Sequence, residues 1–116
     1  MTFNVEIVLR ERDYAVTEEI HTSSRPAEWT EPDVEQVLKS MLLAIDRIKN
    51  PGESERYVAL RGFSWIVEPT SGGVVIAIEI PSGAAVAGPF DVDQRKLDSL
   101  ITRVLAAAAP ARPVVH

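Results

Sequence analysis

Two apolar strands joined by a short turn constrain the fold of this chain more than any other feature. The segments RYVALRGFSWIVE (residues 56–68) and VVIAIEI (residues 74–80) alternate with a period of two, and PTSGG (residues 69–73) separates them. β-branched and aromatic residues on both sides of a Pro/Ser/Gly break are typical of a β-hairpin. The sequence therefore predicts an antiparallel hairpin around which the rest of the chain is organised.

The hairpin also predicts which side chains face the core. The even positions of its second strand share one apolar face and should point inward; they are Val74, Ile76, Ile78 and Ile80. A turn of even length, Ser71–Gly72 or Pro69–Gly72, pairs these even positions with odd ones and brings Phe63 and Trp65 to the same face. A turn of odd length would expose both aromatic side chains, so we favour the even turn.

The opposite face of the hairpin is unusually apolar. In an antiparallel sheet with helices on one side, the other face normally alternates to polar residues, and a contiguous apolar patch usually marks a contact surface. The loop at residues 22–29 and the C-terminal tail are short and mostly polar or small, so a second copy in a twofold dimer is the favoured cover. The predicted interface residues are Val58, Leu60, Ile66, Val75 and Ala77.

Two further strands are predicted near the N-terminus. Residues 3–10 place apolar side chains at odd positions, and residues 14–21 return after a polar turn at residues 11–13. Glu18 interrupts the apolar face of the second of these strands. An inward charge deters pairing with other molecules, so this strand is predicted to lie at an edge of the sheet.

Two amphipathic helices complete the prediction. The first begins at the capping residue Thr30, with Asp33 placed as the acid of a capping box, and carries an apolar stripe over residues 34–48. The second is capped by Asp91 and carries its stripe over residues 97–108. Between the hairpin and this helix, the small residues at 82–90 predict a loop.

The expected fold is therefore α+β. It is a two-layer sandwich in which two helices pack on one face of a four-stranded antiparallel sheet, with the element order ββαββα. Residues 1–109 are predicted to form a single domain, and residues 110–116 a flexible tail.

Composition restricts the functions that this chain can have. It has 116 residues and no cysteine, which excludes disulfides, thiol catalysis and metals held by cysteine. The formal net charge of −5, with lysine and arginine scattered among carboxylates, disfavours a nucleic-acid partner. No apolar run approaches the roughly 18 residues of a membrane helix, and the N-terminus lacks a signal-peptide pattern. We therefore predict no membrane partner and a cytoplasmic location.

No catalytic residue, metal or cofactor is predicted. His21 is the only histidine outside the tail, and no second metal ligand stands at a recognisable spacing from it. The segment around Ser64, GFSWI, lacks the second glycine and the following helix of a nucleophile elbow. Gly83 to Gly88 has the spacing of a phosphate loop, but Pro89-Phe90 follows where lysine and serine or threonine should stand.

Arg61 is the strongest candidate for a ligand contact. With the even turn, Arg61 lies on the same face of the sheet as Phe63 and Trp65. There its guanidinium could bind a carboxylate or stack on Tyr57 or Trp65. The simpler interpretation is that Arg61 lies at the end of the core and pairs with Glu53 or Glu55. We favour this structural role.

Two functions remain open. The first is a non-enzymatic protein-interaction module, such as an adaptor, a chaperone-like or an inhibitor-like domain, that acts as a homodimer. The alternative is a small-molecule-binding protein or minor enzyme with a pocket between the sheet and the 82–90 loop, using Arg61, Tyr57 and Trp65, with His21 as a base. The lack of convergent polar groups favours the first.

Overall fold

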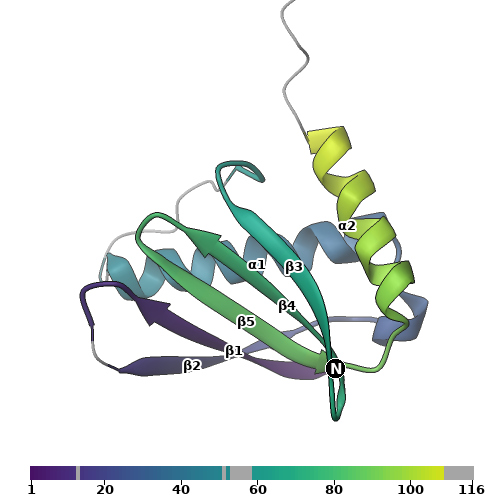
Figure 1. The fold of residues 1–116 in the computed structure, drawn as a ribbon, viewed down its shortest axis with the longest axis horizontal. Coiled ribbons are helices and arrows are strands. Elements are labelled where there is room, and N and C mark those ends of the chain that lie inside the picture. The colour runs from purple at the N-terminus through teal and green to yellow at the C-terminus, as the bar shows by residue number, and fades with distance from the viewer. Residues whose placement is uncertain (13, 51, 53–58, 109–116) are drawn as a thin grey trace, which may run out of the picture.

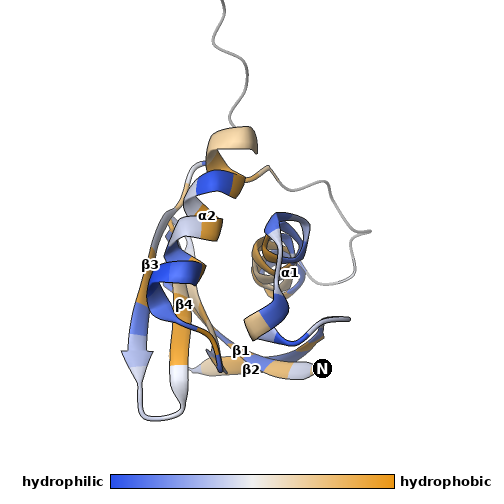
Figure 2. Cartoon of the chain, turned by 90° about the vertical axis from the view of Figure 1, so that its right-hand side faces the viewer, coloured by the Kyte–Doolittle hydropathy of each residue, from blue (hydrophilic) through white to orange (hydrophobic). Residues whose placement is uncertain are grey.

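A five-stranded antiparallel sheet and two helices make up the fold (Figure 1). The computed structural model describes residues 1–12, 14–50, 52 and 59–108. The strands lie in the order β2-β1-β5-β4-β3, and both helices lie on the same concave side of the curved sheet (Figure 2). The elements are β1 (Thr2–Leu9), β2 (Ala15–His21), a 3-10 turn η1 (Pro26–Glu28), α1 (Glu31–Lys49), β3 (Ser64–Thr70), β4 (Gly73–Ile80), β5 (Gly83–Phe90) and α2 (Gln94–Ala108).

The predicted α+β class is confirmed, but the predicted number of strands is wrong. Residues 83–90, expected to be a loop, form β5 at the centre of the sheet between β1 and β4, so the element order is ββαβββα. Glycine, alanine and proline have low strand propensity, so the local sequence pattern does not predict a strand here. Small residues are nevertheless required there. A Cβ on Gly83 would lie 2.4 Å from the backbone oxygen of Val8, and Ala85 and Ala87 are fully buried.

The even turn predicted for the hairpin is confirmed. β3 and β4 pair so that Trp65 lies opposite Ile78, and only Ser71–Gly72 separates the last pair of residues. Phe63 and Trp65 are half-buried and pack against the core. The first strand begins at Ser64, later than the predicted start at Arg56, and residues 53–58 lie outside the described part of the chain. The inward residues that are fully buried are Val67, Val74, Ile76 and Ile78.

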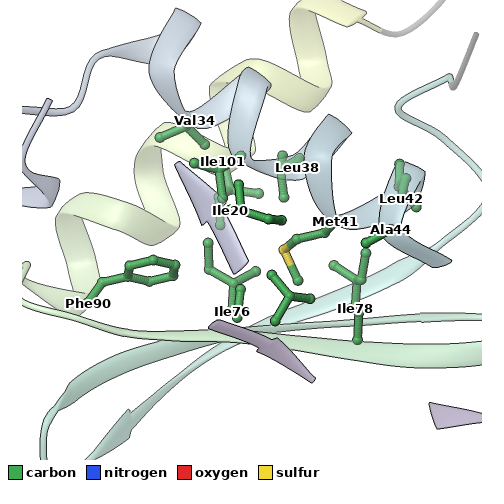
Figure 3. Packing of buried hydrophobic residues seen from close by; sticks show 14 of the residues in the cluster. Ile20, Val34, Leu38, Met41, Leu42, Ala44, Ile76, Ile78, Phe90 and Ile101 are labelled. Atoms are coloured by element: carbon green, nitrogen blue, oxygen red, sulfur yellow. The ribbon is translucent and has the colours of Figure 1, made fainter. Parts of the chain in front are cut away.

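The core lies between the concave face of the sheet and the helices (Figure 3). Leu38 and Met41 of α1 have no exposed surface and lie over the centre of the sheet. At one end of the core, the Phe90 ring meets Phe3 and Trp29 in edge-to-face contacts, with ring centroids 4.8 and 4.9 Å apart. Such aromatic pairs add to the stabilisation that their buried area provides.

Acidic side chains mark the start of each helix. Asp33 Oδ2 accepts hydrogen bonds of 2.9 Å from both the backbone N–H and the hydroxyl of Thr30, as the sequence predicts for α1. The predicted cap of the second helix is wrong by two residues. Asp93, and not Asp91, accepts a hydrogen bond of 3.1 Å from the backbone N–H of Lys96 at the start of α2.

Replacing Leu38 with Ala should lower the free energy of unfolding by about 2–5 kcal/mol, because the cavity left between α1 and the sheet cannot close fully. Gln36→Ala is the matched control on the exposed side of the same helix, and it should change stability by less than about 0.5 kcal/mol. Urea unfolding of both variants measures the difference. Equal stability of the two would place α1 outside the core.

Replacing Gly73 with Ala should also destabilise the hairpin. Its φ is +137°, and an added Cβ would lie 2.2 Å from the backbone oxygen of Phe90, so backbone has to move. We expect a loss of about 1–3 kcal/mol or more. Gly62→Ala has a positive φ but nothing within 4 Å of the added Cβ, and it should cost less in the same unfolding measurement. A smaller loss at Gly73 than at Gly62 would contradict the close approach of β4 and β5.

Candidate functional site

The face of the sheet that points away from the helices carries a row of apolar side chains. The strand registers place Ile66, Ala77 and Val86 side by side across β3, β4 and β5. Neither described helix covers this side (Figure 2). Three more apolar residues flank the row, and we name the whole set the outer patch: Val8, Ile66, Val75, Ala77, Ala84 and Val86.

The largest side chains of the outer patch are open to solvent. Val8 is 44% exposed, Ile66 49% and Val86 40%, while Val75, Ala77 and Ala84 are half-buried between them. Single exposed apolar residues are ordinary on protein surfaces, but a contiguous set usually marks a binding surface. The outer patch is therefore the leading candidate site.

Glutamates border the outer patch on both sides. Glu6 pairs in register with Val86, Glu68 with Val75, and Glu79 with Ala84, and Glu19 lies farther out on β2. All four are exposed, and none has a hydrogen bond or ion pair from its side chain to another described residue.

Lysine and arginine are absent from the outward positions of the described strands, and all five strands are described in full. Arg10, beyond the end of β1, lines a surface cavity of about 550 Å³ together with Glu79. The site is thus apolar at its centre, with glutamates around its margin and Arg10 beside Glu79 at one end.

Both edges of the sheet deter strand addition. β2 is an edge strand, as predicted, and its inward Glu18 forms an ion pair of 2.7 Å with Arg47 of α1. At the other edge, Pro69 of β3 has no N–H to donate, and the Gln94 side chain donates a hydrogen bond of 3.0 Å to the Val67 carbonyl. The face of the sheet is therefore a better candidate for a contact surface than its edges.

Three of the five predicted interface residues lie on this face. Ile66, Val75 and Ala77 lie on it as predicted. Leu60 does not: it precedes β3 and is buried in the core, so its predicted place on the outer face is wrong. Val58 lies outside the described residues.

Sequence reasoning misses the other half of the outer patch. Ala84 and Val86 belong to the strand that the pattern reading takes for a loop. Val8 gives the one usable signal, because it breaks the alternation of polar residues at the even positions of β1.

The residues predicted to bind a ligand do not converge. Arg61 is exposed and lines an open cavity of about 480 Å³ near the end of α1, with Asp46, Lys49 and apolar residues at its base. Trp65 packs against the core and is not among the residues that line this cavity, and Tyr57 lies outside the described residues. The expected pocket beside an 82–90 loop is wrong as stated, because residues 83–90 are part of the sheet.

His21 shows no catalytic arrangement. Its Nδ1 lies 2.9 Å from the hydroxyl of Thr2, and it lines a cavity of about 230 Å³ with Asp33 and Ser40. The Asp33 carboxylate is already occupied as the cap of α1. Among the described residues there is no group of three or more histidine, aspartate or glutamate side chains that could hold a metal ion.

One exposed arginine has a shifted pKa. A hydrogen bond to Glu28 and the charge of its carboxylate raise the pKa of Arg25. This pair lies on η1, away from the outer patch, and suggests no chemistry.

Comparisons with known proteins identify no family. No protein-family model matches the chain, and searches of curated proteins and of solved structures found no significant match. Neither α1 nor α2 is long and apolar enough to cross a membrane, and no other helix occurs in the described part of the chain apart from η1.

Substitution should destabilise the fold much more at Leu60 than at Ile66. Leu60→Ala should lower the free energy of unfolding by about 2–5 kcal/mol, because Leu60 is 8% exposed and belongs to the core. Ile66→Thr keeps the β-branch and should change stability by less than about 1 kcal/mol, because the side chain is half exposed. Denaturant unfolding of the two variants checks this, and an equally large loss for Ile66→Thr would mean that the outer patch serves the fold itself.

Proposed function

We propose that this chain is a non-enzymatic protein-interaction module that binds through the outer patch. The observation that supports this most strongly is the apolar row of Ile66, Ala77 and Val86 on a sheet face that neither described helix covers. Burying a valine or isoleucine side chain completely contributes about 1.5–3 kcal/mol, so a partner over this row gains substantial binding energy.

The fold suits this role because the patch sits on a rigid support. Every outer-patch residue belongs to a strand whose inward neighbours are held in the core by α1 and α2. A binding surface on regular structure is ordered before its partner arrives, so little conformational entropy is lost on binding. An adaptor, a chaperone-like domain or an inhibitor-like domain could each use such a face.

Self-association is the form of binding that the sequence predicts. A twofold contact would place the same patch against itself. It would also bring the glutamates that border both patches into one interface, without a lysine or arginine from any outward strand position. This charge distribution favours a partner of different composition over a second copy.

The small-ligand alternative has one observation in its favour, the cavity beside Arg61 and Lys49. An anion there would meet both cations but also the carboxylate of Asp46. The cavity is open, and few polar groups converge in it, which ligand sites normally require. We therefore place the function at the outer patch.

Affinity capture with matched variants tests the proposal. The wild type should enrich a protein from a lysate of the source cells that Ile66→Thr/Val86→Thr loses and that Tyr14→Ser retains. Tyr14 is 57% exposed and lies outside the five strands, so it controls for loss of a large exposed side chain elsewhere. The captured protein should then bind the purified chain with the same dependence on Ile66 and Val86. Capture that is equal for all three chains would refute the outer patch as the binding surface.

Sedimentation of the purified chain at micromolar concentration tests self-association separately. A dimer that Ile66→Thr/Val86→Thr converts to a monomer would make a second copy the partner of the outer patch. A wild-type monomer would exclude the predicted homodimer at that concentration.

A further inference from the structure

We infer that the partner of the outer patch is a cationic amphipathic helix, which lays an apolar stripe over Ile66, Ala77 and Val86 and places lysine or arginine beside the glutamates at the margin. This inference rests on the proposed function, since it assumes that the outer patch is a binding surface. It adds the chemical class of the partner.

The charges around the patch point to this class. Glu6 lies beyond Val86 on the β1 side of the row, and Glu68 lies next to Val75 on the β3 side. Their side chains are exposed and have no partner among the described residues, so both carboxylates are free to accept hydrogen bonds from a bound cation. Exposed ion pairs each add little affinity, but complementary charge steers association and rejects partners of the wrong sign.

The same charges disfavour other occupants. A second copy would oppose carboxylates with carboxylates, and like charges across an interface are unfavourable. An anionic lipid surface or a nucleic acid would meet the same repulsion, which the net charge of −5 reinforces. A cationic segment is the occupant whose charge complements this face.

The dimensions of the row match a helix. Ile66 and Val86 lie on β3 and β5, one strand to either side of Ala77 on β4. Neighbouring strands are about 4.8 Å apart, so the two larger side chains are separated by roughly 10 Å, close to the 10–12 Å diameter of a helix. Ala77, between them, has the shortest side chain of the three, so an apolar stripe laid over the row can contact all three residues.

A designed peptide pair provides the test. The cationic probe is a helix of about five turns with leucine at i, i+3, i+4 and i+7 and lysine at the remaining positions. The matched probe has glutamate in place of every lysine. In amide NMR titrations, the cationic peptide should shift signals of β3, β4 and β5 around Ile66, Ala77 and Val86. It should bind at least about tenfold more tightly than the anionic peptide, and added salt should weaken its binding.

Variants of the full chain locate the charge effect. Glu6→Gln/Glu68→Gln should weaken binding of the cationic peptide at least about threefold, the loss expected from two exposed ion pairs. Glu35→Gln/Asp98→Asn removes the same number of charges from α1 and α2 and should leave the affinity within about twofold of the wild type. Ile66→Thr/Val86→Thr should abolish the shifts while the chain remains folded.

Two kinds of result overturn the inference, and they are distinguishable. If both peptides bind equally, or if the Glu6/Glu68 and Glu35/Asp98 variants behave alike, the preference for a cation is wrong while the outer patch remains a binding surface. If the cationic peptide binds Ile66→Thr/Val86→Thr as tightly as the wild type, the peptide binds elsewhere on the chain. The outer patch is then neither a cation-selective surface nor the proposed binding site for this class of partner. A wild-type dimer that depends on Ile66 and Val86 would assign the face to a second copy.

Discussion

The pairing of β5 with β1 on one side and β4 on the other holds this structure together. It joins the N-terminal hairpin β1–β2 to the hairpin β3–β4, which would otherwise be separate two-stranded units of marginal stability. The inward residues of β5, Ala85 and Ala87, are small and fully buried, so the larger side chains of α1 have room above the middle of the sheet. On its outward side the same strand places Val86 between Ala77 and Glu6, so the strand that completes the core also completes the outer patch.

Much of this fold follows from local sequence patterns. Alternation in β1 and β4, the apolar stripe of α1 and the cap formed by Thr30 and Asp33 each predict an element, and each is present. The register of the β3–β4 hairpin also follows from the sequence. Only an even turn buries the isoleucines of β4 together with Trp65, and a one-residue slip would exchange the two faces.

The errors occur where tertiary contacts override local preference. β5 is a strand because β1 and β4 pair with it on both sides, and its alanine and glycine residues fit the space without indicating a strand. Leu60 is misplaced for a different reason. Gly62 has a φ of +79°, so the chain turns before β3 begins at Ser64, and the period-two parity of β3 cannot be extended back to Leu60. The first error conceals Ala84 and Val86 of the outer patch, and the second places Leu60 on the wrong face.

The outer face differs from an ordinary solvated sheet in how its polar residues are distributed. A sheet face exposed to water normally carries polar side chains throughout. Here the apolar residues are central and the glutamates lie at the margin. Protein interfaces have the same arrangement, with an apolar core and a polar rim. Both edges are protected, one by the Glu18–Arg47 pair and the other by Pro69 and Gln94, so general adhesion through strand addition is deterred. Charge of one sign around an apolar centre disfavours contact between copies of the chain and suits a partner of opposite charge. The face that α1 and α2 leave uncovered thus carries both features of the proposed interaction, an apolar centre and a margin of glutamates.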